Sequence, residues 1–335
     1  MGQRVSVLSS TTTHLLGNVI VWDNHACMPL RPLDERFLPQ LERCRQAGIT
    51  AVTLNAGFGE QTLAEYVRML ATFRRWLGER SQEYRLIEKV EDIVDAKRQG
   101  QLAVCFDIEG MNAIEGQLDL IQLYYDLGVR WMLIAYNNAN RAGGGCQEPD
   151  GGLTDFGRLV IDEMSRVGMV LCCSHTGYRT AREAIDYSSG PVIFSHSNPR
   201  ALHDHPRNIP DDLMRSCAAR GGVIGINGIG IFLGDNDNST EALVRHIDYA
   251  VQLVGDDHVG IGLDYVYDSA ELDEYVQKMS ATFPDGLGYR SGVKMVEPER
   301  LPEVAEALMA KGYDADSLAK ILGGNLLRVA RTTWK

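Results

Sequence analysis

Val170-Leu171-Cys172-Cys173-Ser174-His175 and Val192-Ile193-Phe194-Ser195-His196 are two short apolar runs, and each of them ends on a histidine. Apolar runs of this length with polar boundaries are typical of buried strands. In a barrel of parallel strands the carboxyl ends meet at one mouth, where (β/α)8 enzymes carry their catalytic residues. The two imidazoles are therefore predicted to point into a shared mouth, in an arrangement that suits a metal ion.

Strand and helix signals alternate along the rest of the chain. Helix-like stretches with apolar residues at three- and four-residue spacing, such as 63–73 and 120–127, separate short runs rich in β-branched residues. Eight such runs are predicted as strands: 18–24, 51–55, 102–108, 130–136, 169–174, 191–195, 222–226 and 258–263. The pattern predicts a (β/α)8 TIM barrel, a single domain over residues 1–335, with the site at the carboxyl ends of its strands.

The main alternative fold is an open doubly wound sheet. It requires a glycine-rich phosphate turn after an early strand, and no such turn follows 18–24 or 51–55. The glycine-rich segment 221–228 lacks the GxGxxG order and is interpreted as the seventh strand. Two long segments rich in Gly, Asn, Asp and Pro, 137–153 and 265–298, follow the fourth and eighth strands and are predicted to cover the mouth as lids.

Composition restricts the partners and the compartment. The 335 residues are 44% hydrophobic and carry 33 basic and 45 acidic side chains, a net charge of −12 that does not favour nucleic acid. No secretion signal or membrane-spanning run is found, so a cytoplasmic protein without a membrane partner is expected. The seven cysteines are odd in number and lack Cys-x-x-Cys spacing, which argues against a disulfide framework or a zinc ribbon.

Polar side chains gather at five of the predicted strand ends. His25 and Cys27 follow the first strand and are two residues apart, so they face the same side of an extended segment. The other four residues at strand ends are Glu109, His175, His196 and Asp264. This set contains the ligands for a metal ion and a spare carboxylate.

These residue types indicate hydrolysis by metal-activated water. Two histidines and a glutamate bind Zn²⁺ in hydrolytic enzymes and leave a fourth position for water. The pKa of that water falls from about 15.7 toward roughly 7. Asp264 is then placed to accept the proton and pass it to a leaving amine. If His25 and Cys27 hold a second ion, Glu109 is the residue best placed to bridge the pair.

Other residues fit a structural interpretation. His203, His205, His246 and His258 fall in loop or helix contexts and are interpreted as hydrogen-bonded structural residues. For Cys27 both interpretations stay open, because a thiolate is a good soft ligand while an unpaired buried cysteine is common in protein cores.

At these residues the chain resembles the renal or membrane dipeptidase family of zinc peptidases. The family's Asp-Gly-His-Asn-Asp corresponds to Asp23-Asn24-His25-Ala26-Cys27, and its Val-Ile-Phe-Ser-His-Ser is present unchanged at 192–197. Further matches, in the same order along the chain, are Glu109-Gly110, Ser174-His175, Arg207-Asn208-Ile209-Pro210-Asp211-Asp212, His258-Val259-Gly260-Ile261-Gly262 with Asp264, and Gly323-Gly324-Asn325-Leu326-Leu327-Arg328-Val329.

The resemblance implies a two-zinc barrel that hydrolyses dipeptides, often with a D-residue at the carboxyl side. It assigns Glu109 as the bridge between the ions, His175 and His196 as ligands of one ion, and His25 as a ligand of the other. Arg207 would receive the substrate carboxylate, which a guanidinium fork matches. Asp264 would contact the bridging water. A homodimer is compatible with this resemblance.

The chain departs from the family pattern at two positions. Cys27 stands where the family has an aspartate ligand, and a thiolate binds zinc at about 2.3 Å against roughly 2.0–2.2 Å for a carboxylate oxygen. The metal site of His25 and Cys27 would then be weak, empty or selective for another ion. Tyr136 stands where many members have a histidine that polarises the scissile carbonyl, and its phenol is a candidate donor to the developing oxyanion or to the substrate. Tyr136-Asn137 fits packing and turn chemistry equally well.

The leading hypothesis is a metal-dependent hydrolase of a dipeptide or dipeptide-like amide, with one or two zinc ions. Two alternatives stay open. The first is a mono-metal barrel that holds its ion with Glu109, His175 and His196 and acts on a non-dipeptide substrate as another amide hydrolase, a lyase or a decarboxylase. The second is a non-catalytic descendant of the family.

Overall fold

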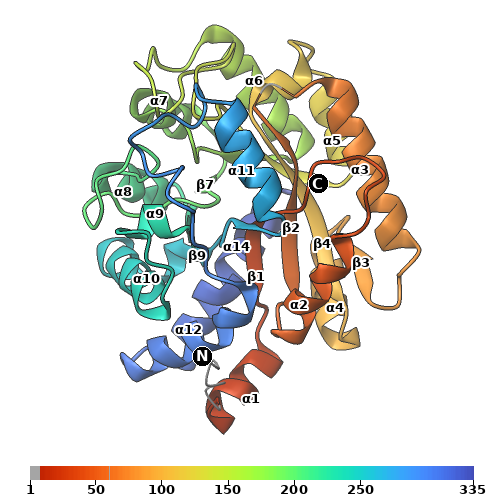
Figure 1. Cartoon of the computed structure of the whole chain (residues 1–335), viewed down its shortest axis with the longest axis vertical. Coiled ribbons are helices and arrows are strands. Elements are labelled where there is room, and N and C mark those ends of the chain that lie inside the picture. Colours follow the sequence, from red (N-terminus) through yellow and green to blue (C-terminus); the bar gives the residue numbers. More distant parts are fainter. Residues whose placement is uncertain (1–7, 60) are drawn as a thin grey trace.

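The computed structural model describes residues 8–59 and 61–335, and its centre is a closed barrel of eight parallel strands (Figure 1). Neighbouring strands pair in chain order, and pairing of the first with the last closes the ring. The strands are β1 (Trp22–Cys27), β2 (Ala51–Phe58), β4 (Leu102–Glu109), β5 (Val129–Leu133), β6 (Val170–Cys172), β7 (Val192–Phe194), β8 (Val223–Ile226) and β9 (Val259–Ile261). The (β/α)8 TIM barrel predicted from the sequence is therefore confirmed.

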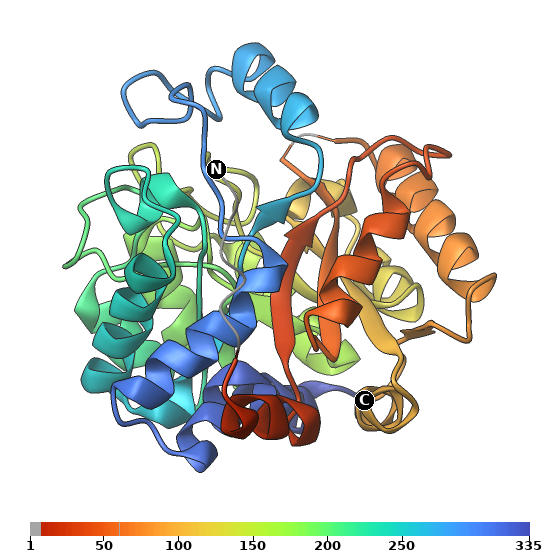
Figure 2. The same ribbon diagram turned by 60° about the horizontal axis from the view of Figure 1, so that its bottom comes forward.

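Helices surround the barrel. The helices around the barrel are α2 (Leu41–Gln46), α3 (Leu63–Gly78), α4 (Val90–Gln99), α5 (Leu120–Asp126), α6 (Asp155–Val167), α7 (Tyr178–Tyr187), α8 (Asp211–Ala219), α10 (Thr240–Val254) and α12 (Leu301–Ala310). Short helical turns lie at Leu38–Gln40, Met111–Ile114, α9 (Gly230–Leu233), Asp256–His258, Pro298–Arg300, α13 (Ala315–Ala319) and Lys320–Gly324. The remaining helices, α1 (Ser10–Asn18), α11 (Ser269–Lys278) and α14 (Asn325–Thr333), lie at the two ends of the barrel (Figure 2).

Alternation along the strands separates two apolar cores. In β4, for example, Ala103 and Cys105 belong to the core inside the barrel, while Val104 and Phe106 pack against the outer helices. This is the period of two expected when both faces of a strand are buried. Leu326 and Val329 of α14 belong to the inner core, so this helix closes the end of the barrel where the strands begin.

The opposite end of the barrel is covered by the segment after β9. In Figure 2, α11 lies above the carboxyl ends of the strands, whereas α1 and the C-terminal helices lie below the barrel. The segment contains a short strand, β10 (Tyr265–Val266), which pairs with β1, and then α11. The prediction that 265–298 covers the mouth is therefore correct. The segment is partly regular, because it contains β10 and α11.

Several predicted boundaries were wrong. The first strand was predicted at 18–24, but Asn18 ends α1 and the strand runs from Trp22 to Cys27. The strand predicted at 130–136 ends at Leu133, so Tyr136 lies beyond it. The sequence analysis also missed β3 (Tyr84–Leu86), which pairs with β4 outside the closed ring. A three-residue edge strand is too short to produce a readable alternation.

The glycine-rich run predicted as the seventh strand forms β8, and one of its glycines allows close contact with β7. A Cβ on Gly225 would lie 2.1 Å from the carbonyl oxygen of Ser195. Because that oxygen belongs to the backbone, Gly225→Ala is expected to lower the free energy of unfolding by about 1–3 kcal/mol in urea titration. Gly190, where an added Cβ would meet open space, gives the control, and Gly190→Ala should change the free energy of unfolding by less than about 0.5 kcal/mol. Equal stability of both variants would contradict this packing argument.

All seven cysteines are free. Within the part of the chain that the structure describes, no helix is both long and apolar enough to cross a bilayer.

Candidate metal centre

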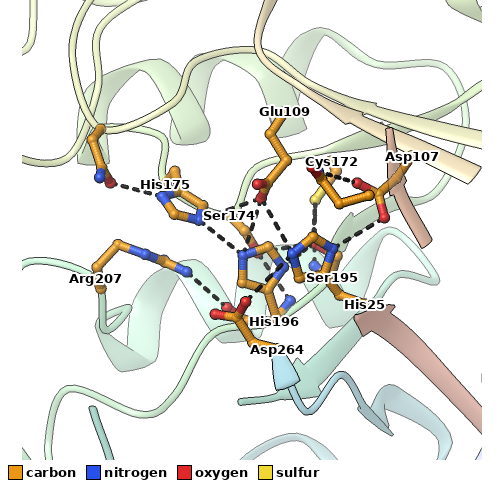
Figure 3. Close-up of polar contacts among 12 residues, drawn as sticks. His25, Asp107, Glu109, Cys172, Ser174, His175, Ser195, His196, Arg207 and Asp264 are labelled. Carbon is orange, nitrogen blue, oxygen red and sulfur yellow. Dashed lines mark hydrogen bonds and ion pairs between the residues drawn. The ribbon is translucent and has the colours of Figure 1, made fainter. Parts of the chain in front are cut away.

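One carboxylate oxygen and three imidazoles converge at the carboxyl ends of the strands (Figure 3). The Oε1 atom of Glu109 lies 3.7 Å from Nε2 of His25, 3.4 Å from Nε2 of His175 and 3.3 Å from Nε2 of His196. The Nε2 atoms of His175 and His196 are 2.9 Å apart. Glu109 Oε1 is buried and has no hydrogen-bond partner among the described residues. Four atoms of the types that bind metal ions thus face a common point, although their residues lie far apart in the sequence.

The barrel brings these groups together through its strand ends. Asp107 and Glu109 continue the inward-facing positions of β4 above Cys105, because residues two apart share a face. His175 and Asp264 follow β6 and β9, and both have a positive φ, 59° and 60°. A positive φ is uncommon for residues other than glycine, and such conformations cluster at functional sites.

Each imidazole is held at its other ring nitrogen. The Nδ1 atom of His25 lies 3.0 Å from Oδ2 of Asp107, and that of His175 lies 2.7 Å from Oδ1 of Asn137. The Nδ1 atom of His196 lies 2.8 Å from the hydroxyl of Ser195. A carboxylate or amide oxygen accepts a hydrogen bond from Nδ1–H, so that Nε2 is the ring nitrogen directed at the centre. Metal-binding histidines are oriented in this way by their second hydrogen bond.

The electrostatic surroundings keep two of the imidazoles neutral. Burial, together with the positive charges of Arg207 and His25, lowers the pKa of His175 and of His196 well below the ordinary value. A neutral imidazole is the form that binds a metal ion. Both side chains therefore have the protonation state that ligation requires.

The pKa values of His25 and Glu109 are both raised. Burial acts to lower the pKa of His25, but the carboxylate of Asp107 at 3.0 Å, with further contributions from Cys27 and Glu109, outweighs burial and raises this pKa well above the ordinary value. Burial raises the pKa of Glu109 to about 8, and the nearby carboxylates of Asp107 and Asp264 add to this effect. A buried carboxylate with an unpaired oxygen is costly unless a cation compensates it.

Cys27 and Asp264 form a second group of possible ligands with His25. The sulfur of Cys27 lies 3.5 Å from Nε2 of His25 and 3.8 Å from Oδ1 of Asp264, which in turn is 3.4 Å from Nε2 of His25. The ligand atoms of this group lie within 4.8 Å of one another, as do those of His25, Glu109 and His196. Burial raises the pKa of the Cys27 thiol to about 12, so only a neighbouring cation would hold it as a thiolate at neutral pH.

Arg207 supplies a buried cation beside this centre. Its side chain donates from Nη2 to the carbonyl oxygen of His196 at 3.1 Å and lies over the ring of Phe232. The Nε and Nη1 atoms are buried without a hydrogen-bond partner among the described residues. A guanidinium with unused donors is suited to an anionic group such as a carboxylate.

Tyr136 lines the cavity beside His175. Its ring stacks on that of His175 with centroids 4.2 Å apart. Burial raises the pKa of its hydroxyl well above the ordinary value, so the group stays protonated and can donate a hydrogen bond.

The site residues predicted from the sequence thus lie together at one site. Six of them line a single cavity of about 790 Å³, counted with its open mouth: Cys27, Glu109, Tyr136, His175, Arg207 and Asp264. The other two, His25 and His196, are fully buried beneath it.

The residues that orient these side chains were not predicted from the sequence. Asp107 holds His25, Asn137 and Ser195 hold His175 and His196, and Asn227 donates to Oδ2 of Asp264 at 2.8 Å. The alternation of Asp107 with Glu109 on one strand face is a signal that could have indicated the first of them. No local pattern marks Asn137 or Asn227, because their partners come from other strands.

The four histidines interpreted as structural lie outside both ligand groups. His246 and His258 donate to the carbonyl oxygens of Leu233 and Gly222. His205 donates to the carbonyl oxygen of Leu287 and stacks with His203.

A metal ion fits the residues that are present. Glu109 has an unpaired buried oxygen, and the Nε2 atoms around it belong to oriented imidazoles, of which those of His175 and His196 are neutral. Nitrogen and carboxylate ligands of this kind suit zinc and similar divalent ions. Fold and site together define the class of metal-dependent (β/α)8 hydrolases.

Comparison with known proteins identifies the family. A model of the membrane dipeptidases, Peptidase family M19, matches residues 40–335, so the chain belongs to that family. It is 31% identical over 280 residues to an uncharacterized protein in the pqqA 5′ region of Klebsiella pneumoniae, which covers 80% of this chain and 96% of that protein. It is 30% identical over 237 residues to the dipeptidase aclJ of Aspergillus oryzae, which covers 69% of this chain.

The match spans only about half, 51%, of the Aspergillus protein's length. Among solved structures, an amidohydrolase from Pseudomonas aeruginosa has a TM-score of 0.87 at 27% identity and covers 96% of this chain and 99% of that one. The resemblance stated from the sequence motifs is therefore confirmed.

Proposed function

We propose that the protein is a metal-dependent dipeptidase, a single-domain hydrolase that cleaves dipeptides or closely similar small amides. The observation that carries this proposal is the convergence of three Nε2 atoms on the unpaired Oε1 of Glu109, next to the unpaired donors of Arg207. The test is turnover of a dipeptide panel by protein loaded with zinc, cobalt or manganese. Absence of turnover with every ion would contradict the proposal.

Two ions, zinc by preference, account for the two overlapping groups of ligands. Glu109, His175 and His196 would hold the first ion, and His25 with Cys27 would hold the second, with Glu109 shared between them. The shared role is supported by the similar distances from one oxygen to all three imidazoles. When bound, such ions act as Lewis acids toward the scissile carbonyl and increase the acidity of water.

The protein residues bind and orient the substrate around this centre. The free Nε and Nη1 groups of Arg207 would donate to the carboxylate of the substrate. This fixes one end of the dipeptide and leaves its peptide bond over Glu109 and His175, which line the same cavity. Fixing the reactants in this way supplies part of the rate acceleration.

Asp264 and Tyr136 are the proposed proton-transfer and hydrogen-bonding groups. Asp264 is oriented by the donor Nδ2 of Asn227 and would take a proton at its carboxylate and return it to the leaving amine. Tyr136 keeps its hydroxyl proton and would donate a hydrogen bond to the oxygen of the carbonyl under attack.

Binding of a metal ion by Cys27 gives a spectroscopic prediction. Cobalt-loaded wild-type protein is expected to show a sulfur-to-cobalt charge-transfer absorption in the near ultraviolet, because a thiolate would be in the coordination sphere. Cys27→Ser should lose this band. Cys27→Asp should lose the band but keep two ions per chain, since a carboxylate replaces the sulfur. A wild-type protein with two cobalt ions and no such band would contradict ligation by Cys27.

The number of metal ions per chain distinguishes this proposal from the alternative of a mono-metal enzyme. The replacement of the family's aspartate by Cys27 is the observation that favours that alternative. One ion per chain that does not increase with added zinc, together with no dipeptide turnover, would favour that alternative. The expected cytoplasmic location, the absence of nucleic-acid and membrane partners and the homodimer remain predictions.

A further inference from the structure

The cavity above the metal centre is walled by an apolar cluster that is separate from both cores of the barrel. Its buried members are Phe58, Ile229, Ile231, Phe232, Val276, Phe283 and Tyr289. They come from the end of β2, from the segment after β8 and from the segment 269–298 that covers the mouth. Most of them line the cavity itself.

Ion pairs and hydrogen bonds hold α11 in place above the cavity. Arg31 binds both Asp268 and Glu271, at 2.7 and 3.0 Å, and the backbone N–H of Leu30 donates to Glu271 at 3.1 Å. The side chain of Glu271 is largely buried. The position of α11 is thus fixed by the loop that follows β1.

The loop after α11 is attached to other parts of the site. Asn137 donates to the carbonyl oxygen of Thr282, and Gln147 donates to the hydroxyl of Tyr289. His205 donates to the carbonyl oxygen of Leu287 and accepts from the backbone N–H of Arg207. The walls of the cavity are therefore connected to the residues that form the site, which favours a preformed pocket.

The side of the cavity next to Cys27 is apolar. Met28, Leu30, Val266 and Leu272 line it. A series of rings leads from α11 to the metal centre: Tyr275 packs on Phe58 at 5.1 Å, Phe58 packs on Tyr136 at 5.1 Å, and Tyr136 stacks on His175.

The side next to Arg207 is also apolar. Phe232 lies against the guanidinium, and Tyr289 packs against both Phe232 and Phe283. A carboxylate on Arg207 would place the side chain of the residue that carries it among these three rings.

Several polar side chains that line the cavity already have partners within the protein. Glu271 accepts from Leu30 and Arg31. Asn55 donates to Asp107, and Asn137 is engaged by His175 and Thr282. Among the described lining residues, Arg207 is the group with unused buried donors. A charged or amide side chain on the substrate would lose hydration against the apolar walls. The existing hydrogen bonds of Glu271, Asn55 and Asn137 leave these groups little capacity to replace it.

We propose that the preferred substrates are dipeptides in which both side chains are apolar and the amino-terminal one is large, of the size of Leu, Met or Phe. This inference rests on the proposed dipeptidase function. The amino-terminal side chain packs against Leu30, Val266 and Leu272, and the carboxyl-terminal one packs against Phe232, Phe283 and Tyr289. Burial of a side chain of that size is favourable, whereas burial of an unpaired polar one is costly.

The test compares near-isosteric side chains in metal-loaded enzyme. Met-Leu is compared with Gln-Leu and Glu-Leu, and Leu-Met with Leu-Gln and Leu-Glu, each with both configurations of the second residue. The methionine peptide is expected to exceed its polar counterparts in kcat/KM by about tenfold or more in both series. Gly-Leu should be poorer than Met-Leu by a similar factor.

Substitutions in α11 test whether this preference comes from the apolar side chains that line the cavity. Leu272→Ala should lower kcat/KM for Met-Leu several-fold more than for Gly-Leu, because glycine has no side chain to contact Leu272. Asp273→Ala, on the exposed side of the same helix, is the control and should behave as wild type with both peptides.

Two outcomes distinguish the failure of this inference from that of the proposed function. If Glu-Leu and Gly-Leu are cleaved as efficiently as Met-Leu, the enzyme is a dipeptidase and the inferred preference is wrong. If none of the peptides is cleaved by the metal-loaded protein, the proposed function fails, and this inference fails with it.

Discussion

Glu109→Gln is expected to abolish dipeptide turnover and metal retention together, with a loss of activity of about a thousandfold or more. Such a loss corresponds to ~4 kcal/mol of transition-state stabilisation. The reason is that one oxygen of Glu109 faces the Nε2 atoms of three imidazoles, and an amide cannot supply the negative charge shared between two cations. The measurement is zinc content per chain after dialysis, together with kcat/KM for the same preparation.

The fold should survive this substitution. Glu109 is buried with an unpaired oxygen, and burial raises its pKa to about 8, so the carboxylate is a cost to the metal-free protein. Glu109→Gln protein without metal should therefore be at least as stable in urea as metal-free wild type. Glu91→Gln, at an exposed position of α4, is the matched control and should keep full activity. A Glu109→Gln protein with normal zinc content and turnover would contradict the assignment.

Substitution of Arg207 gives the second large effect. Arg207→Met is expected to lower kcat/KM for a dipeptide by about 100- to 1,000-fold, because loss of a buried partner of a charged group costs roughly 2–5 kcal/mol. The Nε and Nη1 donors of this side chain have no partner among the described residues, so they are available to a substrate carboxylate. Metal content should not change, since Arg207 is not among the proposed ligands.

A dipeptide amide gives the decisive comparison for Arg207. Wild-type enzyme should prefer the free carboxylate over the amide, and Arg207→Met should lose most of that preference. Arg207→Lys keeps the positive charge but lacks the two-pronged guanidinium, so this variant should retain only part of the preference for the carboxylate. Arg98→Met, on the exposed surface, serves as the control. The assignment would fail if the Arg207→Met variant discriminated between acid and amide as wild type does.

The strand-end residues of the site could be predicted because β/α periodicity determines them. His175 and His196 follow apolar runs that fold as β6 and β7, and parallel strands bring such ends together whatever their separation in the sequence. Glu109 could be placed for the same reason, as the last residue of β4. The ligand roles of Glu109, His175 and His196 followed from their residue types, whereas the role of Arg207 came from the family resemblance.

Other features could not be read from the sequence because they depend on contacts between distant segments. The helix α11 has a sequence dominated by polar residues, and its position depends on Arg31 and Leu30, which lie far away in the chain. Asn137 orients His175 from a backbone conformation with φ of 57°, which no local motif indicates. The first strand was placed too early because Asn18 and Val19 end a helix before the strand starts.

The most direct test is a crystal structure of zinc-loaded protein with anomalous diffraction recorded at the zinc absorption edge. The account predicts an anomalous peak about 2.0–2.2 Å from a carboxylate oxygen of Glu109 and from Nε2 of both His175 and His196. Zinc bound elsewhere, with these three atoms free of any peak, would contradict it.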